Sequence, residues 1–329
     1  MFIKDNTLHI TVLSLFDGMG CGRIALEKLK KYLCKKYKVE KVVFIYYASE
    51  IKKVAIKCSN SNWEDIIQIG DVTKVRYQDN ELITDNGVFK VDNIDLLIGG
   101  SPCQNFSVAR TSIYAIDGLE GDKSKLFYEY LRILKESKPT YFLLENVKMK
   151  NDSKEQLDNY LGFNGIYFNS RLVSYQNRPR YYWTNIDFKI SEDKKVSFQD
   201  FKETDYNECK KYKVNRTPSR EKMWCNGQGK GGRESCKNIT YADKINCITR
   251  KQDRSPNSGL IELDNFCRFL SRRELEQGQT VPVGYTKALT YSQAQDVLGD
   301  GWTVDVIVEI LKGISKVPKV KKYIQGELF

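Results

Sequence analysis

Apolar residues come in short, nearly continuous runs along the first half of the chain, and a glycine, serine or acidic residue follows most of these runs. We expect buried strands over residues 8–15, 42–48, 94–98 and 139–144, with a further strand ending at residue 69. Helical spacing follows these strands over residues 22–33, from near residue 51, and over residues 126–134. Strands that alternate with helices of this length predict an α/β fold with a doubly wound, Rossmann-like parallel sheet.

The regular pattern ends after about residue 186. Residues 187–265 are polar and rich in Lys, Asn, Gly and Ser, which favours a separate, irregular module. Helical spacing returns over residues 291–298 and 304–311, on either side of Gly299-Asp300-Gly301-Trp302. We therefore predict two domains, the first formed by residues 1–186 and 285–329 and the second, smaller one by residues 187–284.

The charge balance points to a polyanionic partner. Among 329 residues, 53 Lys and Arg stand against 42 Asp and Glu, a net charge of +11, and nucleic acid is the foremost polyanion for such a protein. The alternative is a lysine-rich protein that is basic without binding anything. No apolar stretch approaches the roughly 20 residues needed to span a bilayer and no signal-peptide pattern opens the chain, so we expect no membrane partner and a cytoplasmic location.

Cysteine and histidine usage excludes several kinds of chemistry. The nine cysteines include no Cys-x-x-Cys pair and read as free thiols of a reducing compartment. Cys225, Cys236 and Cys247 are evenly spaced, but not as zinc ligands are, so we predict no metal. The single histidine, His9, makes a Ser-His-Asp triad, a Cys-His pair or a multi-histidine metal site improbable.

One cysteine occupies a position suited to a nucleophile. The turn Gly99-Gly100-Ser101-Pro102-Cys103-Gln104 directly follows a predicted buried strand. Its glycines allow close approach of a backbone or a flat ligand, and Pro102 restricts the conformations of its neighbours. Open α/β sheets bind ligands beyond the carboxyl ends of their strands, where this turn lies. The alternative for Cys103 is the role most cysteines have, that of a packed apolar side chain.

The glycine turn after the first predicted strand is a candidate cofactor site. Gly18, Gly20 and Gly22 allow an adenosine-type ligand to approach a helix N-terminus. Glu50 and Asp71 end the next two strands, where carboxylates can accept hydrogen bonds from a ribose and from an adenine amino group. Glycines at such a junction can also serve packing alone, because the spacing is not a complete Gly-x-Gly-x-x-Gly.

Two further segments carry charged groups. Glu145-Asn146 ends the fifth predicted strand at the mouth of an apolar wall, where the pKa of a carboxyl group can rise enough for it to donate a proton. Gln176-x-Arg178-x-Arg180 places two arginines on one side of an extended segment. The alternatives are an exposed loop acid and an ordinary solvated surface.

Together these segments resemble the DNA (cytosine-5) methyltransferase family. Phe16-x-Gly18-x-Gly20 is similar to its cofactor motif, Pro102-Cys103-Gln104 to its nucleophile motif, Glu145-Asn146-Val147 to its acid motif and Gln176-x-Arg178-x-Arg180 to its arginine motif, in the family's order. The turns at 14–18, 48–50, 70–72, 99–103 and 178–183 most resemble the branch that contains the mammalian de novo methyltransferases.

The resemblance implies a role for each of these residues. Cys103 would add to C6 of a flipped cytosine, while Glu145 would bind and protonate N3 and C5 would take the methyl group of S-adenosylmethionine, leaving S-adenosylhomocysteine. Arg180 would hold O2 of the base, and Arg178 and Asn146 would brace the site. The implied cofactor contacts are Phe16, Gly18, Gly20, Glu50, Asp71 and Trp302.

The resemblance also implies where double-stranded DNA binds. The residues from Gln104 to Lys125 would form a loop that closes over the base, hinged at Gly118 and Gly121. Residues 187–284 occupy the position of the family's target-recognition domain. The expected DNA contacts are Gln104, Ser107, Arg110, Arg216, Arg220, Arg250 and Arg254.

Two departures and several alternatives remain. Asp300 and Gly301 replace residues that are frequently Asn and Ser in the family, which affects the expected cofactor affinity. An RNA (tRNA) cytosine-5 methyltransferase, a catalytically silent DNA-binding homologue and a Rossmann oxidoreductase are the other readings. One catalytic domain that clasps one base needs no second subunit, so we expect a monomer. The target sequence and the presence of a cognate restriction endonuclease stay open.

Overall fold

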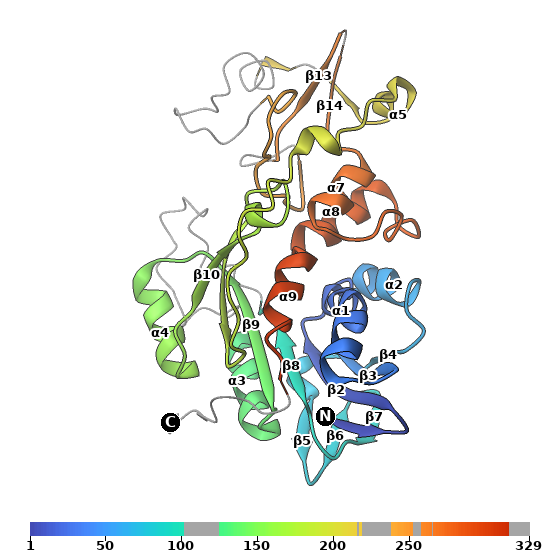
Figure 1. Ribbon diagram of the computed structural model, residues 1–329. Coiled ribbons are helices and arrows are strands. Elements are labelled where there is room, and N and C mark those ends of the chain that lie inside the picture. The colour runs from blue at the N-terminus through green and yellow to red at the C-terminus, as the bar shows by residue number, and fades with distance from the viewer. Residues whose placement is uncertain (102–124, 216, 219–237, 253–257, 265, 316–329) are drawn as a thin grey trace. The chain divides into compact units, whose positions relative to one another are not determined.

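The computed structural model describes residues 1–101, 125–215, 217–218, 238–252, 258–264 and 266–315 (Figure 1). The chain divides into two compact units, and each is described by itself. The first comprises the described residues of 1–168, 179–190 and 307–329, and the second those of 169–178 and 191–306. These limits differ from the expected domains at residues 169–178, 187–190 and 285–306, and the roles assigned to the two domains stay predictions.

An eight-stranded sheet forms the centre of the first unit. Seven strands follow the order β10-β11-β9-β8-β2-β3-β4, and β1 pairs with β2 outside this path. The strands are β1 (Phe2–Lys4), β2 (Thr7–Leu15), β3 (Lys41–Ser49), β4 (Ile66–Gln68), β8 (Leu96–Gly99), β9 (Tyr141–Val147), β10 (Ile166–Asn169) and β11 (Pro179–Thr184). Strands β4, β3, β2, β8 and β9 are mutually parallel, whereas β11 runs antiparallel to β9 and β1 to β2. The predicted α/β fold with a parallel-dominated sheet is confirmed.

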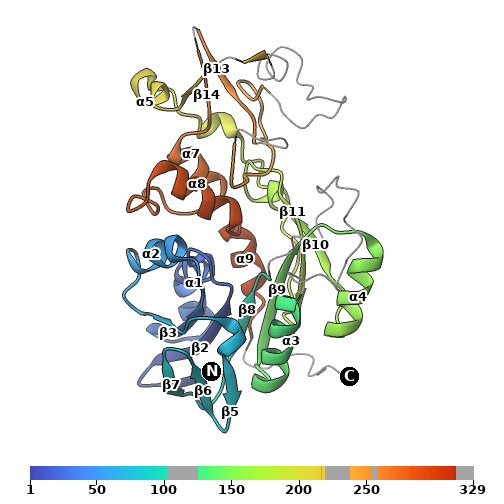
Figure 2. The ribbon, with the colours of Figure 1, turned by 180° about the vertical axis from the view of Figure 1, so that it is seen from behind.

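Helices cover both faces of this sheet because alternate strand residues point to opposite sides. Leu13 and Leu97 pack in one apolar cluster with Tyr130 of α3 (Lys125–Ser137). On the other face, Ile98 approaches Gly22 of α1 (Cys21–Tyr37). Figures 1 and 2 accordingly show α1 and α3 on opposite sides of the strands. Further helices of this unit are α2 (Lys53–Asn60) and α4 (Asn151–Leu161).

A small antiparallel sheet between β4 and β8 was not expected from the sequence. It consists of β5 (Arg76–Gln78), β6 (Glu81–Thr84) and β7 (Gly87–Lys90). Asp79 and Asn80, with φ of 52° and 62°, form the tight turn between β5 and β6. The Asp-Asn pair is the local signal for this hairpin.

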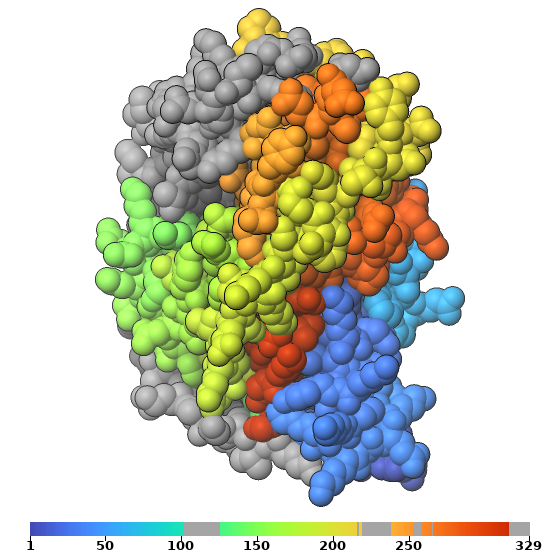
Figure 3. All heavy atoms as spheres, turned by 45° about the horizontal axis from the view of Figure 1, so that its top comes forward, coloured from blue at the N-terminus to red at the C-terminus, as the bar shows by residue number. Residues whose placement is uncertain are grey.

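The second unit combines short strands, short helices and long irregular stretches. Its sheet has the order β12-β14-β13, with β12 (Lys213–Val214), β13 (Ile261–Leu263) and β14 (Phe266–Arg268). Its α-helices are α5 (Tyr206–Lys210), α7 (Arg272–Gly278) and α8 (Tyr291–Asp300), and α9 (Val304–Leu311) runs from this unit into the first. The 3-10 helices η3 (Ser170–Leu172) and η4 (Phe198–Asp200) also belong to it. The segment around η4, yellow-green in Figure 3, lies beside the orange segment of the same unit. The two are joined by a hydrogen bond from the Phe198 N–H to the Asp243 carbonyl over 2.7 Å.

A buried ion pair holds this irregular unit together. Arg268 of β14 donates from Nη1 to Glu274 Oε2 over 2.7 Å and from Nη2 to Glu274 Oε1 over 2.9 Å, and both residues have no exposed surface. Arg268 Nη2 also reaches the carbonyl of Glu203. Strand β14, helix α7 and the chain before α5 are thus joined by charge-assisted hydrogen bonds in the interior.

Among the described residues, no helix has both the length and the apolar character needed to cross a membrane.

The close contact of β8 with its neighbours makes Gly99 sensitive to substitution. A Cβ at this position would lie 2.9 Å from Tyr130 Cε2 and 3.1 Å from the Leu15 carbonyl oxygen. Because the second neighbour is backbone, we expect Gly99→Ala to lower the free energy of unfolding by about 1–3 kcal/mol. Urea unfolding followed by circular dichroism measures this loss. An unchanged midpoint and slope would contradict the close packing of β8 against β2.

Candidate active site

The candidate site lies at the edge of the sheet where the parallel strands end. The chain leaves β2 towards β3 on one side, whereas β8, on the other side of β2, leads to β9. This reversal of strand order between β2 and β8 is the point at which open α/β sheets bind ligands. Phe16 follows β2 there, and Ser101 comes two residues after the end of β8.

The turn after β2 has an unusual backbone conformation. Phe16, Gly18 and Gly20 all have positive φ, of 58°, 62° and 85°, and Gly20 is the N-cap of α1. Glycine adopts such values without steric cost, but Phe16 does not. Gly22 serves packing instead, because a Cβ there would lie 2.3 Å from Ile98 Cδ1. Gly18 and Gly20 therefore serve the backbone conformation of the turn and Gly22 serves packing, and the cofactor contacts expected at Gly18 and Gly20 stay predictions.

Glu50, the expected ribose acceptor, organises this turn. Its Oε2 accepts a hydrogen bond from the Gly18 N–H, and its Oε1 accepts from the N–H groups of Ile51 and Lys52, each over 2.8 Å. The carboxylate thereby ties the end of β3 to the glycine turn. Since a carboxylate can accept about four hydrogen bonds, capacity for a ribose hydroxyl remains.

Asp17, which the sequence analysis did not single out, is buried within the turn. Its Oδ1 accepts hydrogen bonds from the Ser14 hydroxyl over 2.6 Å and the Tyr46 hydroxyl over 2.5 Å. Its Oδ2 is buried and has no partner among the described residues. Burial, opposed by these two hydrogen bonds and reinforced by the Glu50 carboxylate, raises the pKa of Asp17 to about 6. The signal in the sequence was an acid inside a glycine turn between two apolar strands.

Two side chains complete the edge beyond β3 and β4. Asp71 is the N-cap of the 3-10 helix η1 (Val72–Lys74), and its Oδ1 accepts from the Thr73 N–H over 2.9 Å. Ile51, directly after Glu50, is 70% exposed although it is strongly apolar. Sequence reasoning missed Ile51, whose exposure depends on the fold. Glu50, Asp71 and Ile51 offer two acceptors and an apolar surface, which fit a nucleoside such as that of S-adenosylmethionine.

Glu145 forms an ion pair that joins β9 to β11. Arg180 Nε lies 2.7 Å from Glu145 Oε1, and Glu145 is only 8% exposed. In the antiparallel register Tyr182 is opposite Glu145, so Arg180 reaches back by two residues along the same face of the sheet. The exposed loop acid and the solvated arginine surface, the alternatives for this pair, are wrong.

Asn146 connects this pair to the turn that carries the expected nucleophile. It is fully buried, its Nδ2 lies 3.4 Å from the Ser101 hydroxyl oxygen, and its Oδ1 accepts from the Val147 N–H. Ser101 is the last described residue before the cysteine turn. Cys103 and Gln104 lie outside the described residues.

Arg178 is buried within the second unit and contacts backbone. Its Nη1 donates to the Ile248 carbonyl over 2.9 Å, and its Nη2 donates to the carbonyls of Gly301 over 2.8 Å and Gly299 over 3.2 Å. It therefore braces two loops, and a solvated surface is also wrong here. Trp302, the expected cofactor contact in the returning segment, is half-buried between α8 and α9 in the same unit.

The expected DNA contacts fall largely on residues that are not described. Gln104, Ser107, Arg110, Arg216, Arg220 and Arg254 all lie outside the described residues. Arg250 is described, and its Nε lies 2.5 Å from Asp296 Oδ1 and 3.6 Å from Asp300 Oδ2. Its charge is thus partly offset within the protein. No group of three or more His, Cys, Asp or Glu residues suited to a metal ion occurs among the residues that were placed.

Comparison with known proteins agrees with this geometry. Residues 10–162 match the family described as C-5 cytosine-specific DNA methylase. This part of the chain belongs to that family. An orphan methyltransferase, M.Rho11sI of Bacillus phage rho11s, is 38% identical over 141 residues, 42% of this chain and 23% of the relative. The rice DNA (cytosine-5)-methyltransferase DRM2 is 37% identical over 134 residues, 40% of this chain and 20% of the relative.

The match to these C-5 cytosine methylases is partial in length but extensive in fold. The chain spans about a quarter of the length of the first curated relatives that it matches, with 23%, 26% and 31% covered. The solved Entamoeba histolytica methyltransferase EhMeth superposes with a TM-score of 0.67 at 16% identity, covering 93% of this chain and 97% of that one. Schizosaccharomyces pombe Dnmt2 gives a TM-score of 0.62 at 15% identity, covering 92% and 97%. These likenesses show the Rossmann-like fold.

The buried Asp17 carboxyl predicts a pH-dependent stability. Because its pKa is raised from 3.8 to about 6, the folded state binds the proton more tightly than the unfolded state does. The contribution of Asp17 therefore falls as the pH rises from about 4 to about 6 and stays low above that range. We expect Asp17→Asn to raise the free energy of unfolding by about 2 kcal/mol at pH 8, and by much less at pH 4.5.

Urea unfolding at both pH values measures this difference. Glu64→Gln, which removes an exposed acid of the same unit, is the control and should change neither value appreciably. A destabilised Asp17→Asn protein at pH 8 would show that the ionised carboxyl group stabilises the turn.

Proposed function

We propose that the chain is a DNA (cytosine-5) methyltransferase that transfers a methyl group from S-adenosylmethionine to C5 of a cytosine flipped out of double-stranded DNA. One observation carries the proposal. In the segment that matches the C-5 cytosine methylase family, the glycine turn follows β2 and Ser101 follows β8, and these two strands are direct neighbours in the sheet. Next to them, Glu145 is held by Arg180 at 2.7 Å. An acid, a cation and Ser101, which stands two residues before Cys103 in the sequence, thereby share one edge with the turn that we propose to bind the nucleoside.

The proposed reaction uses this edge in two stages. The Cys103 thiolate forms a bond to C6 of the cytosine while N3 takes a proton from Glu145, which makes C5 nucleophilic. S-adenosylmethionine supplies an electrophilic methyl group. After methylation, a base removes the C5 proton, the electron pair of that C–H bond expels the Cys103 thiolate, and N3 returns its proton to Glu145, which restores the aromatic ring. Arg180, which pairs with Glu145, orients the carboxyl group and holds O2 of the base.

The remaining residues have supporting roles in this proposal. Asn146 links the acid strand to the cysteine turn through Ser101, and Arg178 braces the loops at 247–248 and 299–301. Phe16, Gly18, Gly20, Glu50 and Asp71 receive the cofactor, and Trp302 contributes from the returning segment. C5 and C6 of a stacked base are inaccessible, so the cytosine leaves the duplex at a cost of a few kcal/mol.

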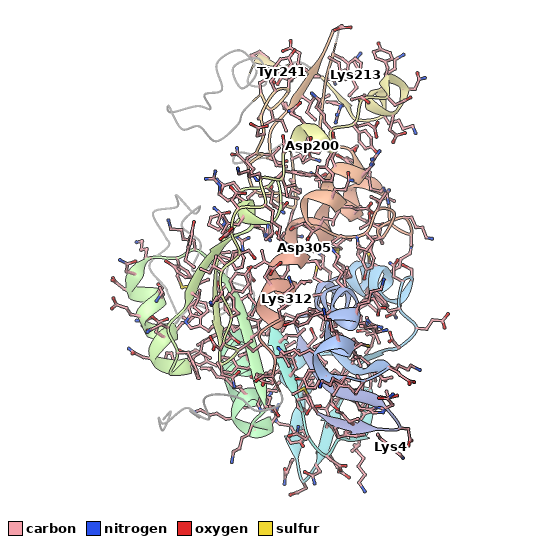
Figure 4. All side chains as sticks on the ribbon, in the orientation of Figure 1. Lys4, Asp200, Lys213, Tyr241, Asp305 and Lys312 are labelled. Atoms are coloured by element: carbon pink, nitrogen blue, oxygen red, sulfur yellow. The ribbon has the colours of Figure 1, made fainter. Side chains whose placement is uncertain are left out.

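The second unit is the proposed target-recognition part. Tyr241 is 90% exposed, with the Lys202 ammonium 5.7 Å from its ring, and the side chains of Tyr241 and Lys213 are seen in Figure 4. Exposed aromatic and cationic side chains of this kind suit contacts with nucleic-acid bases and phosphates. Arg216, Arg220, Arg250 and Arg254 are proposed to act with them. A monomer is proposed to suffice, and we assign no companion endonuclease because the relatives include both orphan and type II methyltransferases.

The nucleophile assignment predicts a complete loss of methyl transfer. With tritiated S-adenosylmethionine and double-stranded DNA, the wild-type protein should label cytosine and Cys103→Ala should not. Cys34→Ala, which removes another free thiol, is the matched control and should retain labelling. Undiminished labelling by Cys103→Ala would exclude Cys103 as the nucleophile. A second experiment incubates the wild-type protein with DNA that contains 5-fluorocytosine, and the absence of a covalent adduct would favour a catalytically silent DNA-binding homologue.

The acid assignment predicts a graded loss. Glu145→Gln keeps the shape of the side chain but cannot donate a proton, so we expect the rate of methyl transfer to fall about 10²–10⁴-fold. Single-turnover labelling measures this fall in rate. The same assay with transfer RNA added beside DNA distinguishes the two substrate classes, and labelling of RNA alone would show that RNA, not DNA, is the substrate. A rate within twofold of wild type for Glu145→Gln would remove Glu145 from proton transfer.

A further inference from the structure

The glycine turn concentrates negative charge that no cation of the described residues offsets. Asp17 is 9% exposed, its Oδ2 has no partner among the residues that the structure describes, and the hydrogen bonds to its Oδ1 come from neutral hydroxyl groups. Within the described part of the chain, the Glu50 carboxylate accepts hydrogen bonds from backbone N–H groups alone, one of them from Gly18 of the same turn. The ion pairs of the described residues include neither acid. Two carboxyl groups therefore act on one turn, and their charges raise each other's energy.

The groups that face Asp17 come from three elements packed around it. Strand β2 provides the Ser14 hydroxyl, β3 and its end provide the Tyr46 hydroxyl and the Glu50 carboxylate, and the Cys21 thiol of α1 faces Tyr46. None of these groups carries positive charge. A buried carboxylate in such surroundings attracts a cation strongly, because water does not screen the interaction.

We propose that Asp17 is a positioning residue that makes the glycine turn favour a positively charged ligand. Its ionised carboxyl group strengthens binding of the sulfonium cofactor S-adenosylmethionine relative to the neutral thioether S-adenosylhomocysteine. The two ligands share the adenosine and the amino-acid ends and differ in the methyl group and the charge on sulfur. The inference rests on the proposed function, because that function brings this cofactor to the turn.

The proposal couples ligand charge to pH. A cation and a proton compete for the buried carboxyl group, so the cationic ligand binds better when Asp17 is ionised. With a pKa of about 6 in the free protein, lowering the pH from 7.5 to 5.5 protonates most of the Asp17 population. We expect the dissociation constant for S-adenosylmethionine to rise about fourfold over this range, while that for S-adenosylhomocysteine changes much less.

The experiment is a calorimetric titration of the full chain with each ligand at pH 7.5 and pH 5.5. The measured quantity is the ratio of the two dissociation constants, which cancels effects of pH on the shared parts of the ligands. We expect Asp17→Asn to weaken S-adenosylmethionine binding about tenfold at pH 7.5 and to remove the pH dependence of the ratio. Glu64→Gln, the surface control, should preserve both the ratio and its pH dependence.

A second variant tests the same network without removing the acid. Tyr46→Phe takes one hydrogen-bond donor from Oδ1 and so raises the pKa of Asp17 further, which should move the change in the ratio to higher pH. If both ligands bind and weaken equally at low pH or in Asp17→Asn, Asp17 merely shapes the turn and the inference is overturned. If neither ligand binds to the wild type, the proposed function fails, and the inference fails with it.

Discussion

The parallel register of four adjacent strands is the constraint on which the candidate site depends. Leu15 of β2 is paired with Ser49 of β3 and with Gly99 of β8, and Gly99 is paired with Leu144 of β9. Each strand therefore reaches the same level, and Phe16, Glu50, Gly100 and Glu145 follow at one edge. A one-residue slip of any strand would send its side chains to the opposite face.

The sequence predicted the first unit well because its strands are buried on both faces and read as apolar runs. The predicted runs at 8–15, 42–48 and 94–98 correspond to β2, β3 and β8. Although the helix predicted over residues 291–298 corresponds to α8, most of the second unit gave no such signal. Its interior holds Arg268 and Glu274, two charged residues with no exposed surface, and hydrophobic patterning assigns such residues to the outside. The unit is organised by paired polar groups, and pairing partners distant in sequence are invisible to a local pattern.

The candidate site was likewise predictable in its positions but not in its partners. Glu145 was expected at a strand end, yet its pairing with Arg180 depends on the antiparallel return of β11, which the sequence did not reveal. The residue pattern alone did not distinguish Arg178 from Arg180, and only the resemblance to the family gave them different roles. In the structure Arg178 donates to the Ile248 and Gly301 carbonyls, whereas Arg180 meets a carboxylate. Arg178 precedes β11 and belongs to the second unit, whereas Arg180 lies within β11 of the first unit, so two nearby arginines have different surroundings.

The turn after β2 combines positioning and electrostatics in one side chain. Tyr46 and Ser14 hold the Asp17 carboxyl group at the start of α1, and the same enclosure that fixes it removes the water that would stabilise its charge. A neutral side chain could accept the same hydrogen bonds without this cost. The ionised acid therefore makes the turn less stable than a neutral side chain would, and a cation bound at the turn would offset that cost. Local stability and the proposed preference for ligand charge thus have a single physical origin, an Asp17 oxygen that has no partner among the described residues.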